Sequence, residues 1–196
     1  MRRTLLAAAL VLVPSLALAH PGLPGHTHDV ATGFLHPLGG LDHILAMVAV
    51  GLLAAQLGGR ALWLVPASFV AAMAAAGLAG MAGVRLPMTE VGIAASVVVL
   101  GGAVALRLAM PVAAATALVG FFAMFHGYAH GLETPETASG LLYGLGFVAA
   151  TALLHAVGIG VGLTVGRIEG AFGRNLVRVA GSLAAVAGVV MLAAAA

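Results

Sequence analysis

The sequence predicts an all-α membrane protein, a six-helix transmembrane bundle that follows a cleaved signal peptide. Of its 196 residues, 62% are hydrophobic and only 7% are charged, whereas an ordinary soluble domain carries about 25% charged residues. So few charges cannot cover a water-facing surface, which makes lipid the natural solvent. Beyond the first segment, six apolar stretches are each long enough to cross roughly 30 Å of hydrocarbon at 1.5 Å per residue.

Residues 1–19 have the three parts of a secretory signal peptide. Arg2 and Arg3 form the charged start, an apolar run follows, and the small residues Ala17 and Ala19 suit a cleavage site. The alternative is an uncleaved first transmembrane helix. Cleavage would make His20 the new N-terminus, whose free amine and ring nitrogen could chelate one metal ion together.

Residues 20–36 are expected to form a histidine-rich periplasmic leader, and residues 37–196 the transmembrane domain. Within the leader, His20, His26, His28 and Asp29 combine three imidazoles with a carboxylate, a set that suits borderline metal ions, although a flexible polar tail is an open alternative. The expected spans are separated by glycine, proline and arginine turn signals. They cover about 37–57, 61–82, 89–106, 111–130, 138–165 and 176–195.

Arginine placement orients the predicted spans. A signal peptide puts the mature N-terminus in the periplasm, so the loops alternate between the two sides. Only Arg85 then lies outside, and positive charge concentrates on the cytoplasmic side, as the positive-inside rule requires. The residues on that side are Arg60, Arg107, Arg167, Arg174 and Arg178. We therefore expect a multi-pass protein of the bacterial inner membrane with both termini in the periplasm.

Missing residue types exclude several functions. The chain has no cysteine and no lysine, which excludes disulfides, zinc–thiolate sites and the phosphate-binding lysine of a P-loop. No basic patch suggests a nucleic-acid partner. Histidine stands out, because its eight residues outnumber the six acidic ones.

The start of the first span carries His36, Pro37, Asp42 and His43. Pro37 suits a first helical turn, which would place Asp42 and His43 about one turn into the membrane. Asp42 could orient an imidazole or bind metal itself. The alternative is that Asp42 only stabilises the N-terminus of the helix.

The outer end of the fourth span carries His126, His130 and Glu133. If the helix continues to Glu133, these side chains lie within about 40° of one another on one face. Two imidazoles one turn apart commonly chelate zinc, copper or nickel. Gly127 and Gly131 would allow a neighbouring helix to approach closely. A hydrogen-bonded interfacial histidine pair is the alternative.

His155 lies near the middle of the fifth span, deeper than the other histidines. Ionisable groups inside lipid are costly and are functional candidates by default. A lone buried histidine is more often a satisfied core residue, but His155 could complete an inner ligand set. The predicted topology brings His36, Asp42, His43, His126, His130 and Glu133 to one membrane level, and Glu90 could add a carboxylate there.

Three segments resemble the HupE/UreJ family of hydrogenase and urease accessory membrane proteins. They are His36-Pro37-x2-Gly40-x-Asp42-His43, Phe125-His126-Gly127-x-Ala129-His130-Gly131-x-Glu133, and Leu154-His155-x2-Gly158. The first two are specific, the third is weak alone, and the resemblance extends over nearly the whole chain. It implies permease-like uptake of nickel, with cobalt a close second, for assembly of the hydrogenase or urease metallocentre.

The expected function is therefore import of a transition-metal ion, with no catalytic cofactor and no enzymatic activity. The expected metal ligands are His20, His36, Asp42, His43, His126, His130, Glu133 and His155. From the ligand types alone, nickel, cobalt, zinc and copper(II) all fit. Two alternatives stay open, an intramembrane zinc hydrolase and a metal sensor or scaffold that does not transport. The expected partners are the metal ion, lipid, and a further copy in a homo-oligomer or a cytoplasmic metallochaperone.

Overall fold

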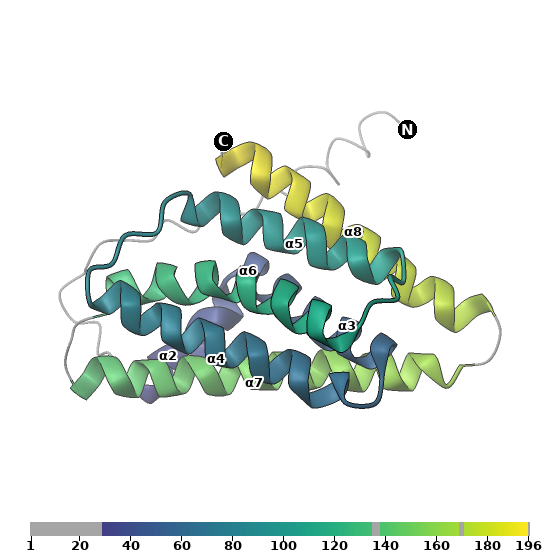
Figure 1. Cartoon of the computed structure of the whole chain (residues 1–196), viewed down its shortest axis with the longest axis horizontal. Coiled ribbons are helices and arrows are strands. Elements are labelled where there is room, and N and C mark those ends of the chain that lie inside the picture. The colour runs from purple at the N-terminus through teal and green to yellow at the C-terminus, as the bar shows by residue number, and fades with distance from the viewer. Residues whose placement is uncertain (1–28, 135–137, 169–170, 196) are drawn as a thin grey trace, which may run out of the picture.

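The computed structural model describes residues 29–134, 138–168 and 171–195. Within these ranges the chain is helical and contains no strand (Figure 1). The helices are α2 (Val30–Gly39), α3 (Leu41–Leu57), α4 (Ala61–Met81), α5 (Thr89–Ala105), α6 (Val112–Glu133), α7 (Ala138–Gly166) and α8 (Ala171–Ala195). The predicted signal peptide and His20 lie outside the described residues.

Four of these helices, α4, α6, α7 and α8, are long and apolar enough to cross a membrane. Helices α2 and α3 pass the same test together but are bent by 86°, so they form either a fifth, broken span or a re-entrant segment. Helix α5 is apolar but has only 17 residues. The all-helical, multi-pass membrane class is therefore confirmed, whereas the predicted count of six spans is not.

The chain turns sharply between α2 and α3. Gly40 has an extended backbone there, with φ −100° and ψ 120°. The expectation that Pro37 opens the first membrane helix is wrong, because Pro37 lies inside α2. Asp29, which belongs to the predicted histidine-rich leader, instead caps α2 by accepting a hydrogen bond from the Thr32 amide at 2.8 Å. Such a cap satisfies a backbone donor that the helix itself leaves unpaired.

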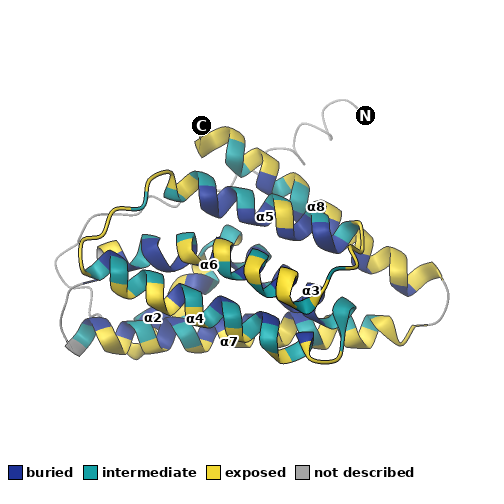
Figure 2. Ribbon diagram, viewed as in Figure 1, coloured by how far each residue is buried: buried dark blue, intermediate teal, exposed yellow. Residues whose placement is uncertain are grey.

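The helices pack mainly in pairs. The most extensive contacts join α4 to α6, α5 to α8, and α7 to both α3 and α2 (Figure 1). Small and medium apolar side chains, such as Val50, Leu53 and Val97, fill the interior. Large apolar side chains remain exposed along the outer faces of α7 and α8 (Figure 2), among them Leu145 and Leu183. Contiguous apolar surface of this kind is rare on soluble monomers and suits contact with lipid.

Glycines allow α4 and α6 to touch backbone to backbone beside the histidines. A Cβ on Gly127 would collide with the Met73 backbone, and one on Gly131 with the backbone of Gly77. The predicted closure of a neighbouring helix over the α6 histidines is thus confirmed. Gly144, Gly166 and Gly83 do not mediate such packing, because a Cβ added at any of them would meet no neighbouring atom within 4 Å.

Candidate metal-binding site

Three helices bring four imidazoles together. His36 comes from α2, His43 from α3, and His126 and His130 from α6. The ring centroids of His36 and His130 are 4.5 Å apart, those of His130 and His43 are 4.7 Å apart, and those of His43 and His126 are 4.8 Å apart. The four rings therefore form a continuous series rather than a set of isolated side chains.

This series runs from the surface into the core. His36 is exposed and His130 is partly buried. His43 is 5% exposed and His126 is fully buried. Each ring thus contacts one that is more deeply buried, so an ion that enters at His36 could be passed inward without leaving nitrogen ligands.

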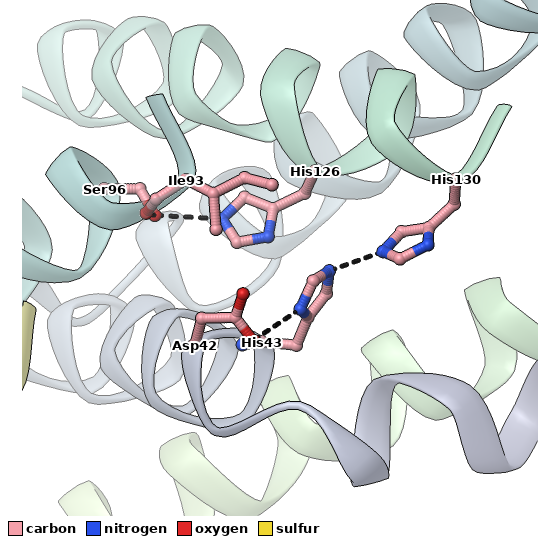
Figure 3. A network of polar contacts seen from close by, with 6 residues as sticks. All are labelled: Asp42, His43, Ile93, Ser96, His126 and His130. Atoms are coloured by element: carbon pink, nitrogen blue, oxygen red, sulfur yellow. Dashed lines mark hydrogen bonds and ion pairs between the residues drawn. The ribbon is translucent and has the colours of Figure 1, made fainter. Parts of the chain in front are cut away.

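Asp42 fixes the orientation of His43. Its Oδ1 atom accepts hydrogen bonds from the His43 backbone amide at 2.8 Å and from Nδ1 of the ring at 2.9 Å (Figure 3). A carboxylate can only accept, so Nδ1 carries the proton and Nε2 of a neutral His43 holds a lone pair. Asp42 also lies in the first turn of α3, where the helix dipole favours negative charge. The orienting role and the helix-stabilising role suggested by the sequence therefore coexist.

His43 in turn decides the tautomer of His130. The two Nε2 atoms are 2.7 Å apart, so one of them must donate to the other (Figure 3). Because His43 Nε2 is the acceptor, His130 donates from Nε2 and has a lone pair on Nδ1. That Nδ1 atom is buried and has no hydrogen-bond partner among the described residues.

Ser96 on α5 fixes His126 in the same manner. The Ser96 hydroxyl donates to the Ile93 carbonyl oxygen at 2.6 Å and lies 2.9 Å from His126 Nε2 (Figure 3). Since its one hydrogen is already used, Ser96 accepts from His126, which leaves the lone pair of His126 on Nδ1. This nitrogen is also buried and unpartnered within the described part of the chain.

The present spacing represents a closed, hydrogen-bonded arrangement of the site. Metal–nitrogen bonds of about 2.0–2.1 Å place two ligand nitrogens about 2.9 Å apart at a right angle and about 3.3 Å apart at a tetrahedral angle. The His43–His130 pair is shorter, at 2.7 Å. Among the described residues no three histidine or acidic side chains are arranged to hold one ion. For one ion to bind between these two Nε2 atoms, the proton of His130 would have to move from Nε2 to Nδ1, and the rings would have to separate by a few tenths of an ångström.

Aromatic side chains that the sequence motifs did not include surround the imidazoles. The Phe147 ring centroid lies 4.6 Å from that of His130 and 5.9 Å from that of His43. Tyr143, one turn earlier on α7, lies 5.8 Å from His36. Their spacing of four residues on an apolar helix could have indicated a common face, but not that this face meets α2 and α6. Ser96, a lone hydroxyl in an apolar helix, was the other available signal.

His155 is buried below this series but is separated from it. It is 1% exposed, and neither ring nitrogen has a hydrogen-bond partner among the described residues. The Phe69 ring contacts both histidines, with its centroid 5.0 Å from that of His155 and 5.7 Å from that of His126. The hydrogen bonds that the core-residue alternative requires are thus missing among the described residues, and the role of His155 in an inner ligand set stays a prediction.

The two acidic candidates and the methionine nearest to His43 lie on three different helices. Helix α6 continues to Glu133, which meets the condition for a shared face, but the side chain of Glu133 is not among those described. Glu90 lies in the first turn of α5 and is exposed. Met47 is fully buried in the apolar core, which is the more ordinary role for a methionine at helical spacing.

The fold and the site define a class, a multi-pass helical membrane protein with histidines aligned in its interior. The chain belongs to the HupE/UreJ family, whose model matches residues 8–191. It is 47% identical to Protein HupE of Rhizobium leguminosarum bv. viciae, over 94% of each chain. No solved structure matches the chain. The family comprises accessory, permease-like membrane proteins and not catalytic enzymes, so the zinc hydrolase alternative is not supported.

Proposed function

We propose that this protein carries a divalent transition-metal ion, nickel or the closely related cobalt, across the bacterial inner membrane into the cell. The ion would supply assembly of a hydrogenase or urease metallocentre. One observation carries the proposal: the imidazoles of His36, His130, His43 and His126 follow one another from the exposed surface to the buried core.

The protonation pattern supports a cation as the cargo. Asp42 and Ser96 each engage one nitrogen of an imidazole and leave the opposite nitrogen as a lone pair. Neutral imidazole is the form that binds metals, and partners that fix its tautomer raise ligand basicity. Nitrogen ligands with one carboxylate and no thiolate suit nickel and cobalt, and the family resemblance favours these two over zinc and copper.

The proposed topology has six crossings, with the bent pair α2–α3 as the first and the short helix α5 as the third. The arginines support it, because Arg107 and Arg174 line one cavity with Gln56 at the far end of α3. Arg85 lines a different pocket with Tyr128, near the α6 histidines. We assign the arginine-rich end to the cytoplasm and the histidine end, with both termini, to the periplasm.

Uptake of nickel and cobalt into proteoliposomes tests the proposal. We expect His130→Ala to lose most of the flux, because the first inward step between His36 and His43 is removed. Met124→Ala is the control, since Met124 lies on the same helix with its side chain exposed. Metal binding without flux in the wild-type protein would instead support the sensor or scaffold alternative, and equal flux in His130→Ala would remove this residue from the pathway.

A further inference from the structure

A second polar feature lies at the end of the bundle opposite the histidines. A cavity of about 330 Å³ opens between the ends of α3 and α7, the start of α8 and the α5–α6 connection. It is lined by Gln56, Arg107 and Arg174 together with small and apolar residues. Gln56 is more than three turns beyond His43 on α3, roughly 20 Å at 1.5 Å per residue. The cavity is therefore distinct from the series of histidines.

Among the described residues, the charged side chains that line this cavity are both positive. None of the described residues that line it is acidic, and neither Arg107 nor Arg174 forms an ion pair among the described residues. Arg174 lies in the first turn of α8, where the helix dipole already favours negative charge and disfavours a cation. Two arginines and the start of a helix thus border one space that an anion would fill.

The backbone at Arg107 forms the turn that ends α5 beside the cavity. Arg107 has φ 52°, in the left-handed region. The amide of Arg107 donates to the Val104 carbonyl, and that of Leu108 to the Ala103 carbonyl, so α5 ends in the hydrogen-bond pattern of a Schellman motif. Glycine is the preferred residue at this position, and another residue strains the backbone. Glycine can therefore replace Arg107 without loss of this turn.

We propose that this cavity binds a phosphate-bearing anion, the phosphodiester head group of an anionic membrane lipid. Guanidinium groups bind phosphate oxygens through paired, charge-assisted hydrogen bonds, and basic pockets between helices at the cytoplasmic face suit anionic head groups. Exposed apolar side chains on both neighbouring helices, Val161 and Leu163 on α7 and Leu176 on α8, could contact the acyl chains. Free inorganic phosphate shares the head-group chemistry and is the other source.

Thermal unfolding of the purified full-length protein in an uncharged detergent tests this assignment. Phosphatidylglycerol is expected to raise the melting temperature saturably, whereas phosphatidylcholine does not. Arg174→Gln should raise the half-maximal phosphatidylglycerol concentration about tenfold, since charge-assisted hydrogen bonds to phosphate are lost. Arg178→Gln is the control, because Arg178 is the next arginine on α8 but does not line the cavity.

The variant Arg107→Gly distinguishes a loss of lipid binding from a loss of folding stability. Glycine suits the left-handed backbone, so this variant should melt no lower than wild type without lipid and yet lose most of the lipid-induced rise. Inorganic phosphate that raises the melting temperature and competes with phosphatidylglycerol would identify the free anion as the occupant. The assignment is overturned if neither phosphate nor phosphatidylglycerol stabilises the wild type, or if Arg107→Gly and Arg174→Gln respond as wild type does.

Discussion

At the scale of single residues, Ser96 determines which nitrogen of His126 is available to a metal ion. We predict that Ser96→Ala weakens metal binding roughly tenfold to a hundredfold, the usual effect of removing a partner that orients a ligand. A cobalt titration of the purified protein measures this. Ser68→Ala is the matched control, because Ser68 also donates to a carbonyl three residues back, at 2.8 Å, with no histidine contact described. Unchanged affinity in Ser96→Ala would contradict the assigned tautomer.

A substitution at Gly40 tests whether transport requires the present position of the Asp42–His43 pair. A Cβ at Gly40 would lie 2.6 Å from Asp42 Oδ1 and 3.1 Å from His43 Nδ1. Its φ of −100° is accessible to alanine, so the strain of Gly40→Ala falls on the pair and not on the backbone. We expect this variant to assemble but to transport nickel several-fold more slowly. Gly39→Ala is the control, because its Cβ would meet nothing within 4 Å; equal slowing of both variants would point to the bend instead.

At the scale of helices, the α4–α6 contact holds the two α6 histidines in place. We predict that Gly127→Ala lowers the melting temperature markedly, because its Cβ would collide with the Met73 backbone, and backbone cannot rotate away as a side chain can. Overpacking commonly costs about 1–3 kcal/mol. Gly120→Ala, on the same helix, would make only ordinary contacts at 3.8 Å and should melt like wild type. A normal melting temperature for Gly127→Ala would show that α4 and α6 can separate without cost.

Helix periodicity also explains what the sequence could and could not predict. His126 and His130 are one turn apart on a single helix, so their proximity followed from local geometry alone. The break at Gly40 did not, because α2 is stabilised by a distant contact in which Gly33 packs on the backbone of Tyr143. The approach of Phe147 and Ser96 to the imidazoles likewise depends on packing between helices that are far apart in the chain. The sequence spacing of these residues does not predict that packing.

At the scale of the whole molecule, the two ends differ in chemistry, one rich in histidine and the other in arginine. The natural chain has no cysteine, so a single introduced cysteine is the only thiol in the protein. Its labelling reports the side of the membrane on which it lies. We predict that a membrane-impermeant maleimide added to intact spheroplasts labels Val84→Cys but not Leu108→Cys. Both side chains are exposed, at 56% and 44%. Labelling of Leu108→Cys alone would show that the orientation is the opposite one, with the histidines at the cytoplasmic side.

The position of Phe69 has a consequence for the energy of the cell. Hydrogen-bonded imidazoles can transfer protons as well as metal ions. An uninterrupted row of them across a membrane would therefore let protons leak down the electrochemical gradient. The Phe69 ring packs against both His126 and His155 and offers a proton no lone pair. His126 Nδ1 and both nitrogens of His155 have no hydrogen-bond partner among the described residues, so in this arrangement no hydrogen-bonded route joins the two histidines there.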